Sequence, residues 1–241
     1  MGRKRRLYSA TLLAGALTLS PEQRKHAQVL RLQAGDELVL FDARGAEADA
    51  RVTQSDRSRL VCEVEAPRAE PPPAARLHLI AGVPKADKLE LVVRMATELG
   101  VTSITLADTE RSVPKLSAQS PKLDRLRRIA IEACAQSEQA WAPELHGLLP
   151  LAAAAARAPA TAERLVFWEG AREPLAIPAS AGTAREVWAI VGPEGGLGER
   201  EVHLLLQSGY VPVTLGGALL RAETAAVVVT SLLLDRIGRL R

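Results

Sequence analysis

The chain has 241 residues, of which 47% are hydrophobic and 24% charged, and its 31 lysine and arginine residues against 28 aspartate and glutamate residues give a net charge of +3. This is the composition of a globular protein, which excludes wholesale disorder, and the length allows one large domain or two small ones. No apolar run approaches the roughly 18–20 residues of a transmembrane helix, and the short apolar stretch at 12–19 lacks the core of a signal peptide.

The N-terminal part of the chain predicts a small β-barrel. Strand patterns occupy 36–41, 48–53 and 59–65, with turn residues between them. A short helix is expected at 21–32, because Ser20 is a good N-cap and proline suits the first helical position. Three consecutive prolines at 71–73 then supply no backbone N–H and favour extended geometry, as in a linker. We therefore expect an N-terminal domain at 1–72.

Beyond the prolines, strand and helix patterns alternate. A strand at 76–83, a helix at 87–99 and a strand at 101–106 form a βαβ unit, so the region 73–241 is expected to contain a parallel sheet. The remaining expected elements are helices at 122–139 and 224–240, an alanine-rich helix or loose connection at 152–162, and strands at 164–168, 186–191 and 211–215.

The charge is unevenly distributed along the chain. Residues 1–31 hold seven cations against Glu22 alone, which is +6, so the remainder carries −3. The basic end suggests a polyanionic partner, with nucleic acid the first candidate, although a solvated tail explains the same pattern. The four histidines are scattered and neither cysteine belongs to a CxxC pair, so we expect no metal site. Two cysteines in a chain of this length favour a reduced, cytoplasmic protein.

Two loops contain residues that point to chemistry, and the first is Gly192-Pro193-Glu194-Gly195-Gly196. It follows an apolar strand, and ligands of open parallel sheets bind outside the carboxyl ends of the strands. Glycines there let backbone amides approach a ligand closely, although a tight strand–helix turn also accounts for them. A helix is expected next, with Gly198 as N-cap and Glu201 completing a capping box. The loop is neither a GxGxxG fingerprint nor a P-loop.

The second loop runs from Leu215 to Ala225 and also connects a strand to a helix. It places Arg221, Glu223 and Thr224 among apolar residues. Because the other apolar segments of the chain exclude charge, Arg221 and Glu223 either form a structural ion pair or belong to a site.

The segments 191–196 followed by Glu201, and 215–225, resemble the last two motifs of the RsmE family, whose members are SPOUT-class methyltransferases that methylate N3 of a uridine in 16S ribosomal RNA. Three further segments occur in the family's order, namely TELGV at 97–101, ERSV at 110–113 and EACAQS at 132–137, and 26–31 and 40–42 resemble its small N-terminal domain. The chain departs from the family at Gln139, where arginine is usual, and at Gly198, where serine is preferred.

The resemblance implies the fold and the assembly. A C-terminal SPOUT domain with a parallel sheet and a deep trefoil knot is expected at 73–241, and the N-terminal β-barrel, of PUA or OB type, is expected to bind RNA. SPOUT enzymes are generally homodimers. The apolar residues at 227–234 in the C-terminal helix are a candidate dimer surface, although packing within one chain explains the same pattern.

The resemblance also implies S-adenosylmethionine as cofactor and 16S ribosomal RNA or the 30S subunit as partner. Three loops are expected to hold the cofactor, at the end of 164–169, at 190–196 and at 215–224, whereas Trp168 is expected to serve in packing. The expected cofactor-binding residues are Ile190, Gly192, Pro193, Gly195, Gly196, Leu215, Gly216, Leu219, Leu220 and Thr224.

The implied chemistry assigns roles to three charged residues. Uridine N3 is a poor nucleophile until its proton leaves, so the site must take that proton or stabilise negative charge on the uracil. Arg221 is expected to stabilise the charge, and Glu194 or Glu223 to accept the proton or to orient Arg221. The arginines expected to contact RNA are Arg3, Arg5, Arg6, Arg31 and Arg111.

Two alternatives remain open at this point. A SPOUT methyltransferase of transfer RNA or of another ribosomal RNA position would carry the same knot motifs. A non-catalytic RNA-binding protein of the same fold would bind RNA without a cofactor, and the intact loops at 192–196 and 220–224 argue against it.

Overall fold

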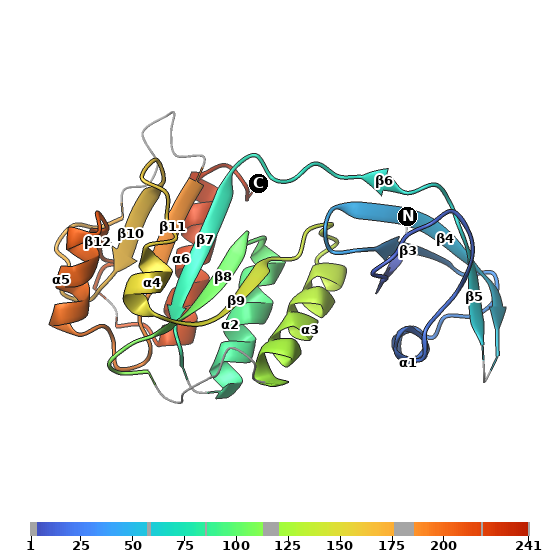
Figure 1. Ribbon diagram of the computed structural model, residues 1–241, viewed down its shortest axis with the longest axis horizontal. Helices are drawn as coiled ribbons and strands as arrows, with labels where there is room; N and C mark the ends of the chain where they lie inside the picture. Colours follow the sequence, from blue (N-terminus) through green and yellow to red (C-terminus); the bar gives the residue numbers. More distant parts are fainter. Residues whose placement is uncertain are drawn as a thin grey trace. The chain divides into compact units, whose positions relative to one another are not determined.

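The computed structural model describes residues 4–56, 59–84, 86–112, 121–175, 186–217 and 219–240. These residues form two compact units, shown in Figure 1. The first unit contains the described residues up to Pro72 together with Ile131–Ala142, and the second contains the described residues from Pro73 to Ala130 and from Pro143 onward. The first unit therefore takes one segment from the middle of the chain.

The first unit is a six-stranded sheet with the helix α1 (Pro21–Val29) and the C-terminal part of a longer helix, residues 131–136. Its strands are β1 (Arg5–Tyr8), β3 (Glu37–Phe41), β4 (Ala46–Ser55), β5 (Leu60–Val64) and β2 (Gly15–Thr18) in that order, with β6 (Arg68–Ala69) paired to β4. The β1–β3 pair is parallel and the others are antiparallel. The helix α1 begins at Ser20, whose hydroxyl accepts the N–H of Gln23, as its cap sequence predicts.

The second unit is a parallel six-stranded sheet with helices on both faces (Figure 1). The strands in spatial order are β12 (Val211–Val213), β10 (Glu163–Phe167), β11 (Glu186–Val191), β7 (Arg76–Gly82), β8 (Ser103–Asp108) and β9 (Glu144–Pro150). Alternate residues of β7 face opposite sides, because side chains alternate along a strand. Leu77 and Leu79 pack with α2 (Ala86–Leu99), α6 (Ala222–Arg236) and the first turns of α3 (Pro121–Gln136), and Ile80 packs with α4 (Leu151–Ala155) and α5 (Glu199–Gln207).

The N-terminal β domain and the C-terminal parallel α/β region agree with the sequence analysis, but four strands were missed. β1, β2, β6 and β9 have no clear alternating apolar pattern, because most of their side chains are exposed or only half-buried. The alanine-rich segment forms only the short helix α4. Three of the apolar residues of α6, namely Val229, Leu233 and Leu234, are buried in the core of their own chain.

Among the described residues, the basic segment that begins at Lys4 continues into the strand β1 and is not a solvated tail. Lys4 Nζ lies 2.7 Å from Asp49 Oδ1, and Arg5 Nη1 lies 2.6 Å from Asp36 Oδ2. The other oxygen of the same carboxylate, Asp49 Oδ2, lies 2.7 Å from Arg68 Nη1. Carboxylates of the first unit therefore neutralise much of the positive charge that the sequence concentrates near residue 5.

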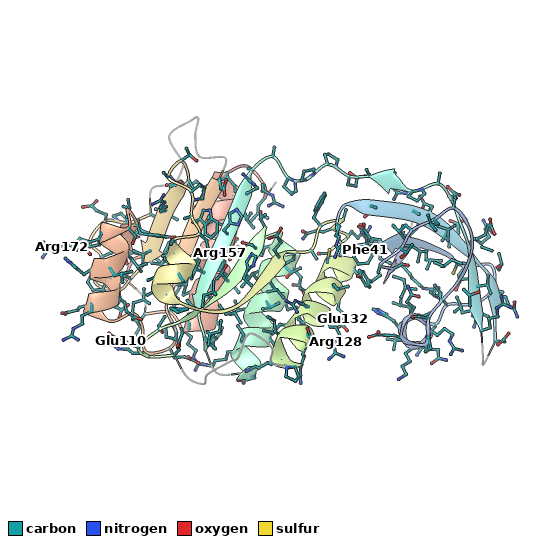
Figure 2. The ribbon with its side chains drawn as sticks, in the orientation of Figure 1. Phe41, Glu110, Arg128, Glu132, Arg157 and Arg172 are labelled. Carbon is teal, nitrogen blue, oxygen red and sulfur yellow. The ribbon has the colours of Figure 1, made fainter. Side chains whose placement is uncertain are left out.

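Arg6 is buried within the same unit, with a side chain only 8% exposed. Its guanidinium pairs with the equally buried Glu47, lies 4.8 Å from the centroid of the Phe41 ring (labelled in Figure 2), and donates to the backbone carbonyl of Gln139 at 2.9 Å. Because the backbone of Gln139 makes this contact, the absence of the usual arginine at 139 leaves it intact.

His78 lies at the opposite end of the parallel sheet from the carboxyl ends of the strands. Its ring stacks on Trp188 with centroids 4.3 Å apart, and Nδ1 lies 2.7 Å from Ser103 Oγ. Burial lowers the pKa of His78 to about 4 and outweighs the opposing effect of the Glu186 carboxylate. The other charged or titratable groups that act on it are Arg76, Glu144 and His146.

We predict that the free energy of unfolding falls as the pH drops from about 6.5 towards 4. The unfolded chain takes up a proton on His78 near its ordinary pKa of 6.5 but the folded chain does so only near 4, so the stability is complete above 6.5 and is lost below it. The difference corresponds to at most roughly 3 kcal/mol. Urea denaturation at a series of pH values measures it. His78→Gln should remove most of this dependence, and His203→Gln, at an exposed position of α5, should retain it.

Candidate functional site

A cavity of about 560 Å³ opens at the carboxyl ends of β10, β11 and β12 in the second unit. Its volume is that of a small-molecule site, and this edge of a parallel sheet is where ligands bind. Residues of three segments form the walls, namely 167–169, 191–197 and most of the described residues between 214 and 225. They include parts of all three loops that the sequence analysis expected around a cofactor.

Most of the residues expected to bind a cofactor lie in these walls. Eight of the ten line the cavity, namely Gly192, Pro193, Gly195, Gly196, Leu215, Gly216, Leu219 and Leu220. Ile190 is fully buried inside β11, and Thr224 is an exposed residue of α6, so neither is in the wall. Trp168, expected as a packing residue, is half-buried and does line the cavity, next to Glu169.

The glycines of the first loop are required by close approach. A Cβ on Gly82, the last residue of β7, would lie 2.5 Å from Pro193 Cδ and 2.8 Å from Pro193 N. Gly196 has a φ of +72°, and a Cβ there would lie 2.6 Å from Glu169 Oε1. A side chain at Gly82 would therefore displace Pro193 of the loop, and at Gly196 the positive φ disfavours any residue with a Cβ.

One buried carboxylate holds two segments of the site together. Glu201 accepts the N–H of Gly198, the N-cap of α5, at 2.8 Å through Oε2, which is the bond that the capping box predicts. Its other oxygen accepts the N–H of Glu110 (labelled in Figure 2) at 2.9 Å. The adjacent Arg111 then donates from Nη1 to the carbonyl of Gly195 at 2.6 Å. Glu201 thus connects the segment at 109–112 to the loop that lines the cavity.

The two glutamates expected in catalysis both form ion pairs with one lysine. Lys88 Nζ, in the first turn of α2, lies 3.4 Å from Glu194 Oε1 and 3.4 Å from Glu223 Oε2. The Glu223 side chain is only 12% exposed, and its Oε2 accepts no hydrogen bond among the described residues. Sequence reasoning missed Lys88, because only the folded chain brings the first turn of α2 to two distant loops.

Arg221 is the exposed N-cap of α6 and follows directly on the cavity wall at Leu220. The structural ion pair between Arg221 and Glu223 that the sequence left open is absent from the described residues, since Glu223 pairs with Lys88. The guanidinium of Arg221 has no hydrogen bond or ion pair with any described residue. It is therefore available to a ligand.

The arginines expected to contact RNA differ in what they present to solvent. Arg5 is ion-paired and Arg6 is buried, as described above. Arg31 is exposed, and its guanidinium has no partner among the described residues. Arg111 is exposed beside the cavity. Arg3 lies outside the described residues.

Two kinds of feature are absent from the part of the chain that the structure describes. It contains no group of three or more histidine, cysteine, aspartate or glutamate residues placed to hold a metal ion. None of its helices has the length and apolar character needed to cross a membrane.

Known families match almost the whole chain. A model described as an RNA methyltransferase domain matches residues 70–234, and one described as an RNA methyltransferase PUA domain matches 19–65. The ribosomal RNA small subunit methyltransferase E of Mycobacterium tuberculosis is 33% identical over 84% of this chain and 79% of its own length. The protein of that name from Aquifex aeolicus is 30% identical over 95% of this chain and 98% of its own length.

Two solved structures are similar over nearly their full length. Ribosomal RNA small subunit methyltransferase E from Neisseria gonorrhoeae, bound to S-adenosyl methionine, is 25% identical with a TM-score of 0.86 and covers 97% of this chain and 98% of its own. A putative methyltransferase from Legionella pneumophila, in complex with the same cofactor, is 28% identical with a TM-score of 0.87 and the same coverage.

We predict that Gly82→Ala destabilises the protein by about 1–3 kcal/mol, because the new methyl group must displace Pro193 and the loop behind it. Urea denaturation measures the loss. Gly217→Ala is the matched control, since a Cβ there meets nothing within 4 Å, and it should change the stability by less than about 0.5 kcal/mol. Equal effects of the two substitutions would contradict the close-approach argument.

Proposed function

The chain belongs to the RsmE family of ribosomal RNA methyltransferases, and on that premise we propose that it methylates N3 of a uridine in 16S ribosomal RNA with S-adenosylmethionine as the methyl donor. The observation that carries the proposal is the cavity at the carboxyl ends of β10, β11 and β12, whose walls are the segments that carry the family motifs. The deep trefoil knot expected for this domain is part of the proposal.

The residues present fit S-adenosylmethionine. Leu215, Leu219 and Leu220 offer an apolar slot for adenine, and Leu219 is 90% exposed in the wall, as expected of a side chain that a ligand covers. The missing side chain at Gly192 lets a ligand approach the backbone in the wall closely, whereas the N–H of Gly196 already donates to the carbonyl of Pro193 at 2.8 Å. When bound, the cofactor supplies a methyl group that is already activated on a sulfonium, so the chain's main task is alignment of the two reactants.

The charged residues divide the remaining chemistry among them. Arg221, exposed and without a partner among the described residues, stabilises negative charge that develops on a uracil carbonyl as N3 loses its proton. Glu194 lines the cavity and is the better placed proton acceptor, whereas Glu223 lies outside the wall, against Lys88. Glu223 then serves to hold the start of α6, from which Arg221 extends.

The first unit is proposed to grip the RNA through arginines that solvent reaches. Arg31 lies within the segment that matches the RNA methyltransferase PUA model. It occupies the left-handed region with a φ of +54° directly after α1, where glycine is favoured. A strained position that keeps an exposed arginine without a protein partner favours a functional role for that side chain. Arg31 of the first unit and Arg111 of the second are therefore proposed as phosphate contacts in place of Arg5 and Arg6.

The proposal extends to the assembly in which the enzyme acts. We take the 30S subunit as the substrate, because phosphate contacts position an RNA without reading its sequence and a folded target supplies the missing selectivity. The enzyme is proposed to work as a cytoplasmic homodimer. The candidate interface consists of Val227, Val228 and Leu232 of α6, which are only half-buried. The other apolar residues of that stretch are buried in the core of their own chain.

Methyl transfer from labelled S-adenosylmethionine to unmodified 30S subunits and to naked 16S ribosomal RNA tests the function directly. N3-methyluridine is expected on nucleoside analysis, with subunits preferred. A different methylated nucleoside would show that N3 of uridine is not the target atom. Cofactor binding without any incorporation would point to transfer RNA or another RNA, and no cofactor binding would favour the non-catalytic RNA-binding protein.

We predict that Arg221→Ala lowers the rate of methyl transfer by at least about tenfold, which is roughly 1.4 kcal/mol of barrier, because the developing negative charge loses its cation. Single-turnover kinetics with saturating cofactor measure it. Arg200→Ala, an exposed arginine of α5, is the control that should leave the rate unchanged. Wild-type turnover by a folded Arg221→Ala variant would remove Arg221 from this role.

We predict that Arg31→Gly weakens RNA binding without loss of stability. Glycine relieves the left-handed backbone, so the free energy of unfolding should stay constant or rise by up to about 1 kcal/mol. Loss of a phosphate contact should weaken binding to 30S subunits by about threefold or more and reduce its salt dependence.

Arg5→Ala is the matched control for Arg31→Gly and should show the opposite pattern, with lower stability and unchanged RNA binding, because Arg5 is paired with Asp36. Filter binding and thermal melting measure the two quantities. A substitution at Arg31 that changes only stability would exclude the phosphate contact.

A further inference from the structure

The charge of the cavity wall bears on which form of the cofactor it retains. We propose that acidic side chains around the cavity, Glu169 and Glu194 with Glu223 behind them, make it select the cationic methyl donor over the neutral S-adenosylhomocysteine that remains after transfer. This inference rests on the proposed function, since it assumes that the cavity holds the cofactor.

Among the described residues, two charged side chains line the cavity, and both are acidic. Glu169 follows β10 and Glu194 lies in the glycine-rich loop, and no lysine, arginine or histidine occurs in the described wall. Glu169 is exposed, and its carboxylate has no partner among the described residues. Its Oε1 lies 2.6 Å from the place that a Cβ of Gly196 would occupy, so the carboxylate lies directly against the loop.

The lysine that the structure describes beside Glu194 does not neutralise this wall. Lys88 is shared between Glu194 and Glu223, at 3.4 Å from each, so that group of three carries a net charge of −1. The Glu169 carboxylate adds a second negative charge, which gives −2 for the four side chains. The side chains of Lys88 and Glu194 are each only 26% exposed and that of Glu223 12%, so water screens these charges less than at an open surface.

Two arginines lie close by but outside the wall. Arg111 is exposed and directs its guanidinium to the backbone carbonyl of Gly195. Arg221 is exposed at the start of α6. Solvent screens both guanidinium groups more strongly than it screens the carboxylates of Glu194 and Glu223, so the ligand in the cavity experiences a negative potential.

Methyl transfer changes the charge of the ligand at one atom. It breaks the bond between sulfur and the methyl carbon, leaves the electron pair on sulfur and forms the bond between that carbon and N3, while the N3 proton passes to the base. The sulfonium thereby becomes a neutral thioether, and the net charge of the molecule falls from +1 to zero. A wall of charge −2 attracts the first form and has no net charge to attract in the second. S-adenosylhomocysteine therefore binds more weakly than S-adenosylmethionine and dissociates more readily.

Isothermal titration calorimetry of the full chain with S-adenosylmethionine and with S-adenosylhomocysteine tests this without any turnover. The measured quantity is the ratio of the two dissociation constants, taken at about pH 8 so that the carboxyl groups are ionised. The wild type should bind the donor at least about threefold more tightly than the product, and raising the ionic strength from about 0.05 M to about 0.5 M should shrink that preference.

Three variants change the charge around the cavity: two make it less negative and the third makes it more negative. Glu169→Gln and Glu194→Gln should each reduce the preference for the donor by about threefold and leave the affinity for S-adenosylhomocysteine nearly unchanged, because only the charged ligand loses an attraction. Lys88→Met should increase the preference by a similar factor, since it removes the cation that the two glutamates share. Glu90→Gln, on α2 and paired with Arg125, is the control that should leave the ratio unchanged.

The outcomes separate this inference from the proposed function. If both ligands bind and the ratio is the same in the wild type, Glu169→Gln and Glu194→Gln, the electrostatic selection is wrong while the methyltransferase assignment stands. If neither ligand binds to the folded wild type, the proposed function fails and this inference fails with it. Glu169 is exposed, so its substitution tests the idea even where Lys88→Met does not fold.

Discussion

The site depends on the buried carboxylate of Glu201. Its two oxygens accept backbone N–H groups from Gly198 and Glu110, so one side chain fixes both the start of α5 and the segment that precedes Arg111. Both bonds go to a buried carboxylate, and leaving either backbone donor unsatisfied there would be costly. Arg111, which follows Glu110, donates in turn to the carbonyl of Gly195, so the double attachment also ties this segment to the glycine-rich loop.

The sequence predicts what local pattern controls and misses what the tertiary structure supplies. The capping box at Gly198, the parallel α/β region and the three loops around the cavity follow from spacing, glycines and the resemblance to a family. Lys88 carries no local signal, because a lysine in the first turn of a helix is ordinary on an exposed surface. Only the packing of α2 against α6 brings it to Glu194 and Glu223, and no periodicity within one segment contains that information.

The basic end of the chain shows how charge counts mislead when partners are distant in sequence. Lys4, Arg5 and Arg6 suggest a polyanion-binding tail, yet each pairs with a carboxylate of the first unit. Their charge serves to fasten an edge strand that apolar residues alone would hold poorly, since only Leu7 of β1 is fully buried. Arginines and lysines that are available to an RNA are therefore better identified by the absence of an ion pair in the structure than by the number of basic residues in a segment of the sequence.

Segment Ile131–Ala142 belongs to the first unit although it is synthesised long after the strands of that unit. Cys134 packs with Phe41 and Ala43, and the carbonyl of Gln139 receives the guanidinium of Arg6, so this unit lacks part of its core until residue 142 has been made. A nascent chain that stops at the proline run therefore exposes the Phe41 side of its sheet. The unit therefore cannot finish folding on the ribosome before residue 142 has been made, and a gene fragment that ends at residue 72 would encode an incomplete domain.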